Sequence, residues 1–254
     1  MYIGVTGFTD KAQVRTALSR VPSDADRLFM VGVLASAKTI QGLPATNPKR
    51  YPARERIADI FINDWRALNL VHYNTRDQSE LAAQLWAALQ WGGVDCDGLQ
   101  LNIVLPDPEV IRGLKRSKPE TTIVLQLNRG TMRVLGGSSE TIADTLVDRY
   151  GALVDHILVD ASGGSGEALV PHEAVAHLIA LDHARTRHGH QFGLCVAGGL
   201  CADNLEDLLV PVQMLVPSFG IDAEGRVRTD DFLDDEKVGR YIDAAYRFFA
   251  GACL

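Results

Sequence analysis

The chain lacks any hydrophobic run that could cross a lipid bilayer. Its longest apolar run is 28-LFMVGVLA-35, whereas a membrane-spanning helix needs about 20 such residues. The first ten residues, MYIGVTGFTD, have no basic region before an apolar stretch, so the sequence predicts no secretory signal. We therefore expect a soluble, cytoplasmic protein without a membrane partner.

Cysteine and positive charge are also scarce. The four cysteines include no CxxC pair, so no disulfide scaffold is predicted. The net charge of −7 argues against nucleic acid as a partner, because proteins that bind it carry a basic surface. Five of the seven histidines lie between residues 172 and 190, without HExxH spacing. This pattern favours a solvated helix over a metal site, and we expect neither a metal nor a cofactor.

What the sequence does have is a regular alternation of short apolar runs with longer amphipathic segments. Continuously apolar runs are typical of buried parallel strands. We predict strands at residues 2–7, 28–35, 68–74, 98–104, 121–128, 156–161, 192–199 and 214–220. Helical patterns cover residues 10–21, 52–64, 77–90, 107–116, 138–153, 171–187, 203–209 and 234–249. Eight such units without a composition break predict one α/β domain, a single (β/α)8 TIM barrel over residues 1–254.

Functional residues of such barrels lie at the carboxyl ends of the strands and in the loops that follow. The polar residues at these predicted positions are Thr6, Lys38, Arg50, His72, Asn74, Gln100, Asn102, Gln126, Asn128, Arg129 and Asp160. Each amide could equally serve a loop hydrogen bond. Asp160 is the strongest candidate, because an unpaired acid after the apolar run 156–159 would be costly to bury. The longest irregular segment, residues 36–51, is expected on the same face.

Small residues at the ends of the last two predicted strands suggest an anion site. Gly198 and Gly199 close the seventh predicted strand, and Ser218, Phe219 and Gly220 close the eighth. Barrels frequently bind phosphate there with backbone N–H groups. We therefore predict a phosphate site and a phosphorylated small molecule as the ligand, with ordinary turn glycines as the alternative.

Short motifs along the whole chain resemble those of the phosphoribosylanthranilate isomerase family, a barrel enzyme of tryptophan biosynthesis. They are 5-VTGFT-9, 49-KRY-51, 158-LVD-160 with 163-GGSGEAL-169, 197-AGGLCADN-204 and 216-VPSFGID-222. The family's counterparts, in the same order, are KICGIT, a KRY-like loop, LLD before GGSGKTF, SGGL before an Asn-containing helix start, and DVSSGVE.

The resemblance implies an Amadori rearrangement of an aminoaldose to an aminoketose, in which a cysteine acts as base and an aspartate as acid. It places the acid at Asp160, the substrate-anchoring arginine at Arg50 and a mobile flap at residues 163–169. It also places phosphate at Gly198, Gly199, Ser218 and Gly220. Thr6 stands at the position of the catalytic cysteine, and His72, Gln100 and Asn102 are expected to bind substrate.

Two functions stay open, because a threonine hydroxyl without an adjacent base does not readily take a proton from carbon. The first is an isomerase or related lyase that acts on a phosphorylated sugar-like substrate, with Asp160 as general acid. The second is a non-catalytic protein of the same descent that binds a phosphate-bearing ligand. The aromatic segment 241-YIDAAYRFF-249 adds the hypothesis of a homodimer contact, although packing of the last helix on the barrel is the preferred interpretation.

Overall fold

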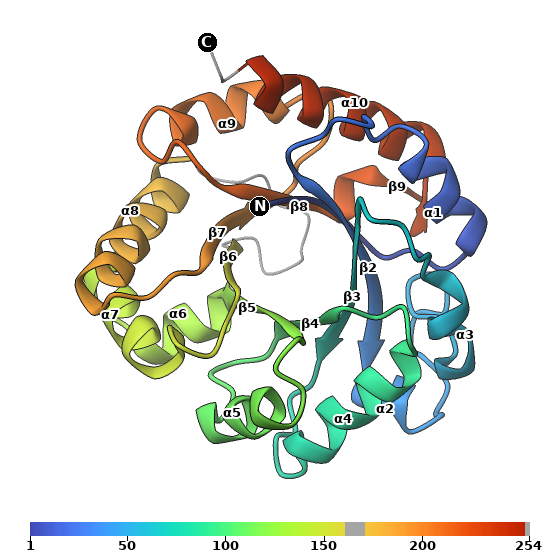
Figure 1. The fold of residues 1–254 in the computed structure, drawn as a ribbon, viewed down its shortest axis with the longest axis horizontal. Helices are drawn as coiled ribbons and strands as arrows, with labels where there is room; N and C mark the ends of the chain where they lie inside the picture. The colour runs from blue at the N-terminus through green and yellow to red at the C-terminus, as the bar shows by residue number, and fades with distance from the viewer. Residues whose placement is uncertain (161–170, 252–254) are drawn as a thin grey trace.

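The computed structural model describes residues 1–160 and 171–251 of the chain. Eight parallel strands follow one another in chain order and close into a barrel, because β8 pairs with β1 as well as with β7. The strands are β1 (Tyr2–Thr6), β2 (Leu28–Ser36), β3 (Ala67–Asn74), β4 (Gly98–Asn102), β5 (Thr122–Asn128), β6 (His156–Asp160), β7 (Gly193–Ala197) and β8 (Gly220–Ala223). The predicted (β/α)8 barrel is confirmed (Figure 1).

Helices surround the strands, as the view along the barrel shows (Figure 1). Those that match the sequence prediction are α1 (Lys11–Leu18), α3 (Arg54–Ile60), α4 (Leu81–Gly92), α5 (Pro108–Ser117), α7 (Ser139–Tyr150), α8 (Pro171–His188), α9 (Leu205–Gln213) and α10 (Asp235–Gly251). Two short helices that the sequence does not predict, α2 (Ala37–Ile40) and α6 (Arg129–Leu135), directly follow β2 and β5. No helix in the described part of the chain is long and apolar enough to cross a membrane.

The inside of the barrel changes from apolar to polar along its axis. In the amino-terminal parts of the strands, a cluster that includes Tyr2, Met30 and Leu70 fills the interior. A larger apolar cluster lies between the strands and the helices. At the carboxyl ends the buried side chains are polar, and they include Thr6, His72, Gln100, Gln126, Asp160 and Asp222. Burying so many polar groups is unfavourable unless they are hydrogen-bonded, which makes this end of the barrel the candidate for a site.

Three of the four aromatic residues of the last helix are buried within this chain, and Phe248 is half-buried. Tyr241, Tyr246 and Phe249 of α10 are each at most 7% exposed, and the ring of Phe249 contacts that of Phe219 with 5.4 Å between centroids. These side chains therefore pack on the barrel, in agreement with the preferred interpretation of the segment.

The last strand begins where the sequence pattern places its end. The pattern predicts a strand at 214–220, but Met214 and Leu215 are 80% and 60% exposed in a turn after α9. β8 starts only at Gly220, which pairs with Cys195 of β7. An apolar run without periodicity does not distinguish a strand from a turn that carries apolar side chains, and here the pairing with β7 and β1 decides the register.

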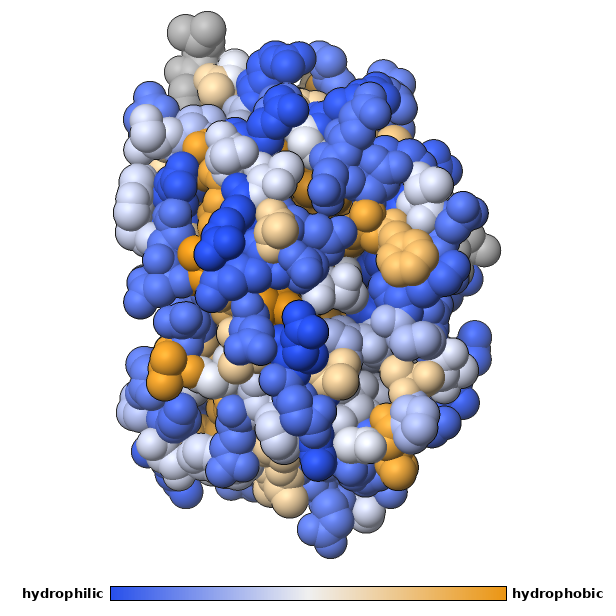
Figure 2. Space-filling model, turned by 90° about the vertical axis from the view of Figure 1, so that its right-hand side faces the viewer, coloured by the Kyte–Doolittle hydropathy of each residue, from blue (hydrophilic) through white to orange (hydrophobic). Residues whose placement is uncertain are grey.

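A small hairpin follows β8 and is tied to the long loop after β2. The strands β9 (Arg228–Thr229) and β10 (Phe232–Leu233) are joined by Asp230 and Asp231, whose φ angles are 49° and 71°. Arg50 contacts a carboxylate oxygen of Asp231 through Nε at 2.8 Å and through Nη2 at 2.6 Å. Lys49 Nζ donates to the Asp230 carbonyl at 3.1 Å. The side of the molecule with α1, α3 and β9 is mainly hydrophilic, with scattered apolar side chains (Figure 2).

Arg228 of this hairpin packs against the end of β1, where only glycine fits. Gly7 has a φ of 108°, and a Cβ atom placed there would lie 1.6 Å from Arg228 Nη2. Arg228 is 6% exposed, donates to the Thr6 carbonyl at 3.3 Å and lies 3.8 Å from Glu224. The arginine therefore joins the hairpin to the first strand.

We expect Gly7→Ala to destabilise the protein by about 3 kcal/mol or more, because backbone strain and displacement of a buried arginine add together. Gly189→Ala is the matched control, since Gly189 also has a positive φ of 69° but no atom lies within 4 Å of the place that a Cβ atom would take there. Urea unfolding of both variants checks the prediction. Equal losses in the two variants would contradict the role assigned to the Arg228 contact.

Candidate active site

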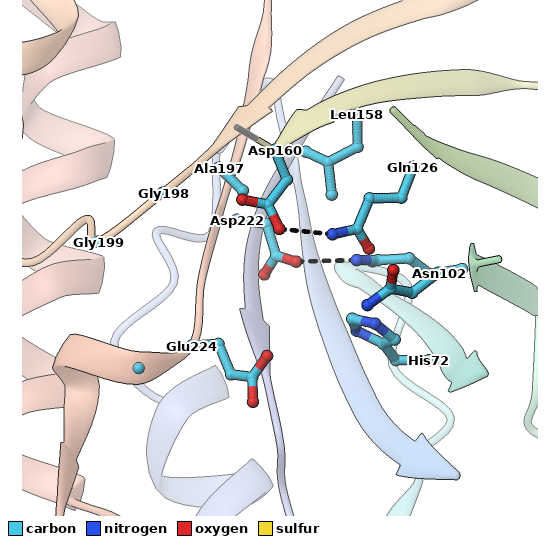
Figure 3. A pocket seen from close by; sticks show the side chains of 12 residues that line it. His72, Asn102, Gln126, Leu158, Asp160, Ala197, Gly198, Gly199, Asp222 and Glu224 are labelled. Carbon is cyan, nitrogen blue, oxygen red and sulfur yellow. Dashed lines mark hydrogen bonds between the residues drawn. The ribbon is translucent and has the colours of Figure 1, made fainter. Parts of the chain in front are cut away.

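A polar pocket opens at the carboxyl ends of the strands, and we call it the inner pocket (Figure 3). Its volume is about 40 Å³, and its lining consists of His72, Gln100, Asn102, Gln126, Leu158, Asp160, Ala197, Gly198, Gly199, Asp222, Glu224 and Gly225. Figure 3 shows the carboxylates of Asp160, Asp222 and Glu224 on one side and Gln126, Asn102 and His72 across from them. So small a pocket can take only a small group of a ligand.

Two buried aspartates lie at the same level of the barrel. The register pairs Ala197 of β7 with Asp160 on one side and with Asp222 on the other. The side chains of both acids line the inner pocket, and the residues are only 4% and 5% exposed. The small side chain of Ala197 separates the two acids, so a ligand in the pocket can meet both.

Each aspartate has its own amide donor. Gln126 Nε2 donates to Asp160 Oδ2 at 2.6 Å. Gln100 Nε2 donates to Asp222 Oδ2 at 3.1 Å, and the Thr6 hydroxyl lies 3.0 and 3.1 Å from the two Asp222 oxygens. These donors fix the orientation of the two carboxylates.

The environment raises the pKa of Asp222 towards neutral pH. Burial raises the pKa of Asp222 to about 7, although the hydrogen bonds from Gln100 and Thr6 favour the ionised form. The negative charges of Glu224 and Asp160 raise that pKa further. A carboxylate whose pKa lies close to the operating pH is well suited to general acid–base chemistry.

The neighbouring imidazole is neutral. Burial lowers the pKa of His72 to about 4, so its ring carries no charge at neutral pH and can only donate or accept hydrogen bonds. Burial also raises the pKa of Glu224, while the charges of Arg228 and Arg50 act in the opposite direction. In residues 1–160 and 171–251, no group of His, Cys, Asp and Glu is placed to hold a metal ion.

Several buried atoms of the inner pocket have no hydrogen-bond partner within the described residues. They are the side-chain oxygens of Gln100 and Gln126 and the Nδ1 atom of His72. These three residues are at most 4% exposed. Because unpaired buried polar atoms are costly, their position in the pocket favours a ligand that brings hydroxyl groups to them.

A wider space, which we call the outer cleft, adjoins the inner pocket and shares His72, Asn102 and Glu224 with it. Its volume is about 620 Å³. The other lining residues are Leu34, Arg50, Tyr51, Asn74, Thr75, Arg76, Val104, Asn128, Arg129 and Gly130. The outer cleft therefore lies over the ends of β2 to β5, whereas the acids of the inner pocket come from β6 and β8 and the turn that follows β8.

Most of the residues predicted from the sequence meet at this end of the barrel. Asp160, His72, Gln100, Asn102, Gly198 and Gly199 line the inner pocket, and Arg50 lines the outer cleft. The predicted role of Gly198 and Gly199 in phosphate binding stays a prediction. Thr6 is fully buried and its hydroxyl donates a hydrogen bond to Asp222, so in this geometry it positions an acid.

The predicted phosphate residues after strand eight lie elsewhere, which corrects that part of the prediction. Ser218 and Phe219 precede β8, and Gly220 begins it. These residues therefore lie at the amino end of the strand, whereas Asp160 lies at the carboxyl end of the barrel. Phe219 is fully buried, and its carbonyl accepts from Arg27 Nη1 at 2.7 Å. The displacement of strand eight along the sequence is the cause. The predicted flap 163–169 lies outside the described residues.

Sequence reasoning misses Asp222 and Glu224 because of the same displacement. β8 runs from Gly220 to Ala223, so Asp222 lies within the strand and Glu224 directly follows it. The sequence does contain a signal for Asp222, since this acid follows the short run 220-GI-221. Asp222 lies, however, beyond the end of the predicted strand.

Comparison with known proteins supports a fold of this class. Neither a family model nor a curated protein matches the chain. Solved structures do, and one is the N-(5'-phosphoribosyl)anthranilate isomerase of Pyrococcus furiosus, with a TM-score of 0.62 and 19% identity over 97% of this chain and 99% of that one. The phosphoribosylanthranilate isomerase of Thermotoga maritima gives 0.60 and 14% over 96% and 98%. The putative copper homeostasis protein CutC of Streptococcus agalactiae gives 0.53 and 17% over 90% and 100%.

The protein is thus a (β/α)8 barrel. More particularly, its fold is like that of the phosphoribosylanthranilate isomerases. At identities of 13–19%, the likeness shows the architecture alone.

Proposed function

We propose that the protein is an isomerase that acts on a small, phosphorylated, sugar-like substrate, in the manner of an Amadori-type rearrangement. The observation that carries the proposal is the pair of buried aspartates, Asp160 and Asp222, in one pocket at the carboxyl end of the barrel. Isomerisation of a sugar requires one group that takes a proton from carbon and another that serves an oxygen.

In this proposal Asp222 supplies the base that Thr6 cannot provide. Its raised pKa, about 7, makes its carboxylate a better proton acceptor than an ordinary aspartate. Asp222 takes the proton from the carbon next to the substrate's carbonyl or imine group, and Asp160 donates a proton to the substrate oxygen. The Thr6 hydroxyl and the Gln100 amide hold Asp222, while the neutral His72 ring and the Gln126 amide face the substrate's hydroxyl groups.

The test follows proton abstraction directly. The protein is incubated in D2O with a panel of aldose and ketose phosphates and with phosphoribosylanthranilate, and proton NMR records exchange at the carbon next to the carbonyl or imine. Fluorescence follows the loss of phosphoribosylanthranilate in parallel. We expect exchange with at least one member, and kcat/KM that rises with pH through about 7 as Asp222 ionises.

The second candidate is a non-catalytic binding protein. The hydrogen bond from the Thr6 hydroxyl to Asp222 favours it, because the residue at the position of the family's catalytic base then does not act as a base. A thermal-shift screen with the same panel separates the two functions. A compound that raises the melting temperature but shows neither exchange nor turnover would support the binding protein and contradict the isomerase.

A further inference from the structure

The carboxylate of Asp222 is buried without a positively charged partner among the described residues. Its hydrogen bonds come from two neutral groups, the Gln100 amide and the Thr6 hydroxyl. The charges that act on it, those of Glu224 and Asp160, are both negative. No arginine, lysine or histidine of residues 1–160 and 171–251 forms an ion pair with it. A carboxylate in such a place is stabilised either by taking up a proton or by a cation that a ligand supplies.

Asp222 also keeps the capacity to accept further hydrogen bonds. An ionised carboxylate accepts about four of them, whereas only the Thr6 and Gln100 side chains donate to Asp222 within the described part of the chain. The oxygen of the Gln100 amide has no partner there either. This oxygen shares its carbon atom with the nitrogen that donates to Asp222, so an open acceptor lies close to the carboxylate. A ligand group at this place must therefore be a donor.

Glu224 brings a second acid to the same place. It follows Asp222 by two positions, and both carboxylates line the inner pocket (Figure 3). Arg50 and Arg228 approach one oxygen of Glu224, at 3.4 and 3.8 Å, but neither arginine lines the inner pocket. Positive charge therefore reaches Glu224 from outside the pocket. The described lining of the pocket itself contains acids and no arginine or lysine.

Gln126 repeats the arrangement of Gln100 across the inner pocket (Figure 3). Its Nε2 donates to Asp160, and its oxygen has no partner within the described residues, although the residue is only 3% exposed. Both glutamines of the pocket thus use their donors on acids and leave their acceptors open. An open acceptor that is buried is costly, so the pocket favours a group with several donors.

The size of the inner pocket and its charge together select the donor. A water molecule needs about 10–15 Å³ of such space, so about 40 Å³ holds an amine with its first carbon atom but no bulky substituent on the nitrogen. Hydroxyl and ammonium groups could both satisfy the glutamine oxygens. A hydroxyl has a single donor and no charge, whereas a protonated primary amine has three donors and one positive charge. The acids therefore favour the amine.

We propose that the inner pocket binds a protonated primary amine, whose N–H groups meet Asp222, Glu224 and the side-chain oxygen of Gln100. The rest of the ligand extends into the outer cleft, which adjoins the pocket. The substrate is then an amino sugar phosphate, an assignment that rests on the proposed function. Binding of the amine is tested separately from turnover.

The experiment compares three compounds that differ only at one end: 1-amino-1-deoxysorbitol 6-phosphate, its N-acetyl derivative and sorbitol 6-phosphate. None has a carbonyl group next to a carbon-bound proton of the sugar chain, so calorimetry with the full chain at pH 8 measures binding without isomerisation. We expect the amine to bind about 10- to 100-fold more tightly than sorbitol 6-phosphate, the size of hydrogen bonds to charged groups. The N-acetyl derivative, which is larger and uncharged at nitrogen, should bind no more tightly than sorbitol 6-phosphate.

Asp222→Asn should abolish the preference for the amine and leave the affinity for sorbitol 6-phosphate as it is. Asp148→Asn is the matched control, because it removes the charge of an exposed acid of α7 that does not line the pocket. It should keep the preference. A measurement on the wild type alone does not depend on the folding of a variant. In ¹⁵N spectra the side-chain amide signals of Gln100 and Gln126 should shift with methylammonium chloride and stay in place with sodium chloride.

Four results would each overturn the proposal. They are equal affinity of the wild type for the amine and for sorbitol 6-phosphate, a preference that persists in Asp222→Asn, a preference that is lost in Asp148→Asn as well, and glutamine signals that do not respond to methylammonium. Absence of binding by all three compounds has the same meaning as equal affinity.

Failure of this proposal and failure of the proposed function can be told apart when glucosamine 6-phosphate is added to the exchange panel in D2O. If the amine is preferred in binding but no compound exchanges its carbon-bound proton, the amine site stands and the isomerase does not. If exchange occurs and no preference for the amine is found, the isomerase stands and the amine site does not.

Discussion

Asp222→Asn is expected to reduce turnover strongly and at the same time to make the protein more stable above neutral pH. The activity should fall by about 10²- to 10⁴-fold, the usual contribution of a general acid or base. The fold should tolerate the change. An asparagine at this position can still accept from the Thr6 hydroxyl, and its amide can donate to the Gln100 oxygen, which has no partner within the described residues.

The stability effect follows from the pKa of Asp222. That pKa is about 7 in the folded protein and near the ordinary aspartate value of 3.8 in the unfolded chain. Between these values the folded state holds a proton that the unfolded state has released. The free energy of unfolding therefore falls as the pH rises from about 4 to about 7. Above that window the ionised, buried carboxylate costs about 2 to 4 kcal/mol, which the asparagine variant avoids.

Urea unfolding at pH 5 and pH 8 measures both parts of this prediction. The wild type should lose more stability than Asp222→Asn between the two pH values, so that the variant is the more stable protein at pH 8. An identical pH dependence of the two proteins would mean that Asp222 does not have a raised pKa. A fully active variant would remove Asp222 from the proposed mechanism.

Asp160→Asn is the second replacement from which we expect a large effect. Its carboxylate accepts from Gln126 Nε2 at 2.6 Å, and the Gln126 oxygen has no partner within the described residues. The glutamine amide can therefore turn to accept from the new asparagine. We expect kcat/KM to fall by about 10²- to 10⁴-fold.

Asp148→Asn is the matched control for this measurement, because Asp148 is an exposed acid of α7, away from the pocket. Both variants lose one negative charge, so a general effect of charge would appear in both. A wild-type rate in Asp160→Asn would show that Asp160 transfers no proton. A comparable loss in Asp148→Asn would show that the assay does not report the site.

The architecture is predictable because it depends on a pattern that repeats. Most of the buried strands are largely apolar runs, and seven of the eight are located with shifts of at most one residue in their starts. The position of Asp160 follows from the same pattern, since β6 ends on that residue. A candidate functional residue at the end of a strand can therefore be predicted when the strand itself is continuous and apolar.

The other half of the acid pair cannot be found in this way. The mainly apolar residues 214–219 resemble a strand in sequence, while the true β8 has only four residues and includes an acid. Its register is set by pairing with β7 and with β1, contacts that join distant parts of the chain. The separation of the acids in the inner pocket from the arginines in the outer cleft likewise arises only when the loops are arranged in space.

The hydrogen bond between Thr6 and Asp222 spans 216 positions in the sequence and lies where β8 closes the barrel against β1. During synthesis the ribosome therefore makes Thr6 long before Asp222. The two residues can meet only after β8 has emerged, and a contact of such long range forms late and slowly. A nascent or truncated chain that ends before β8 would hold Asp160 without Asp222, so pairing of the two acids would report closure of the barrel.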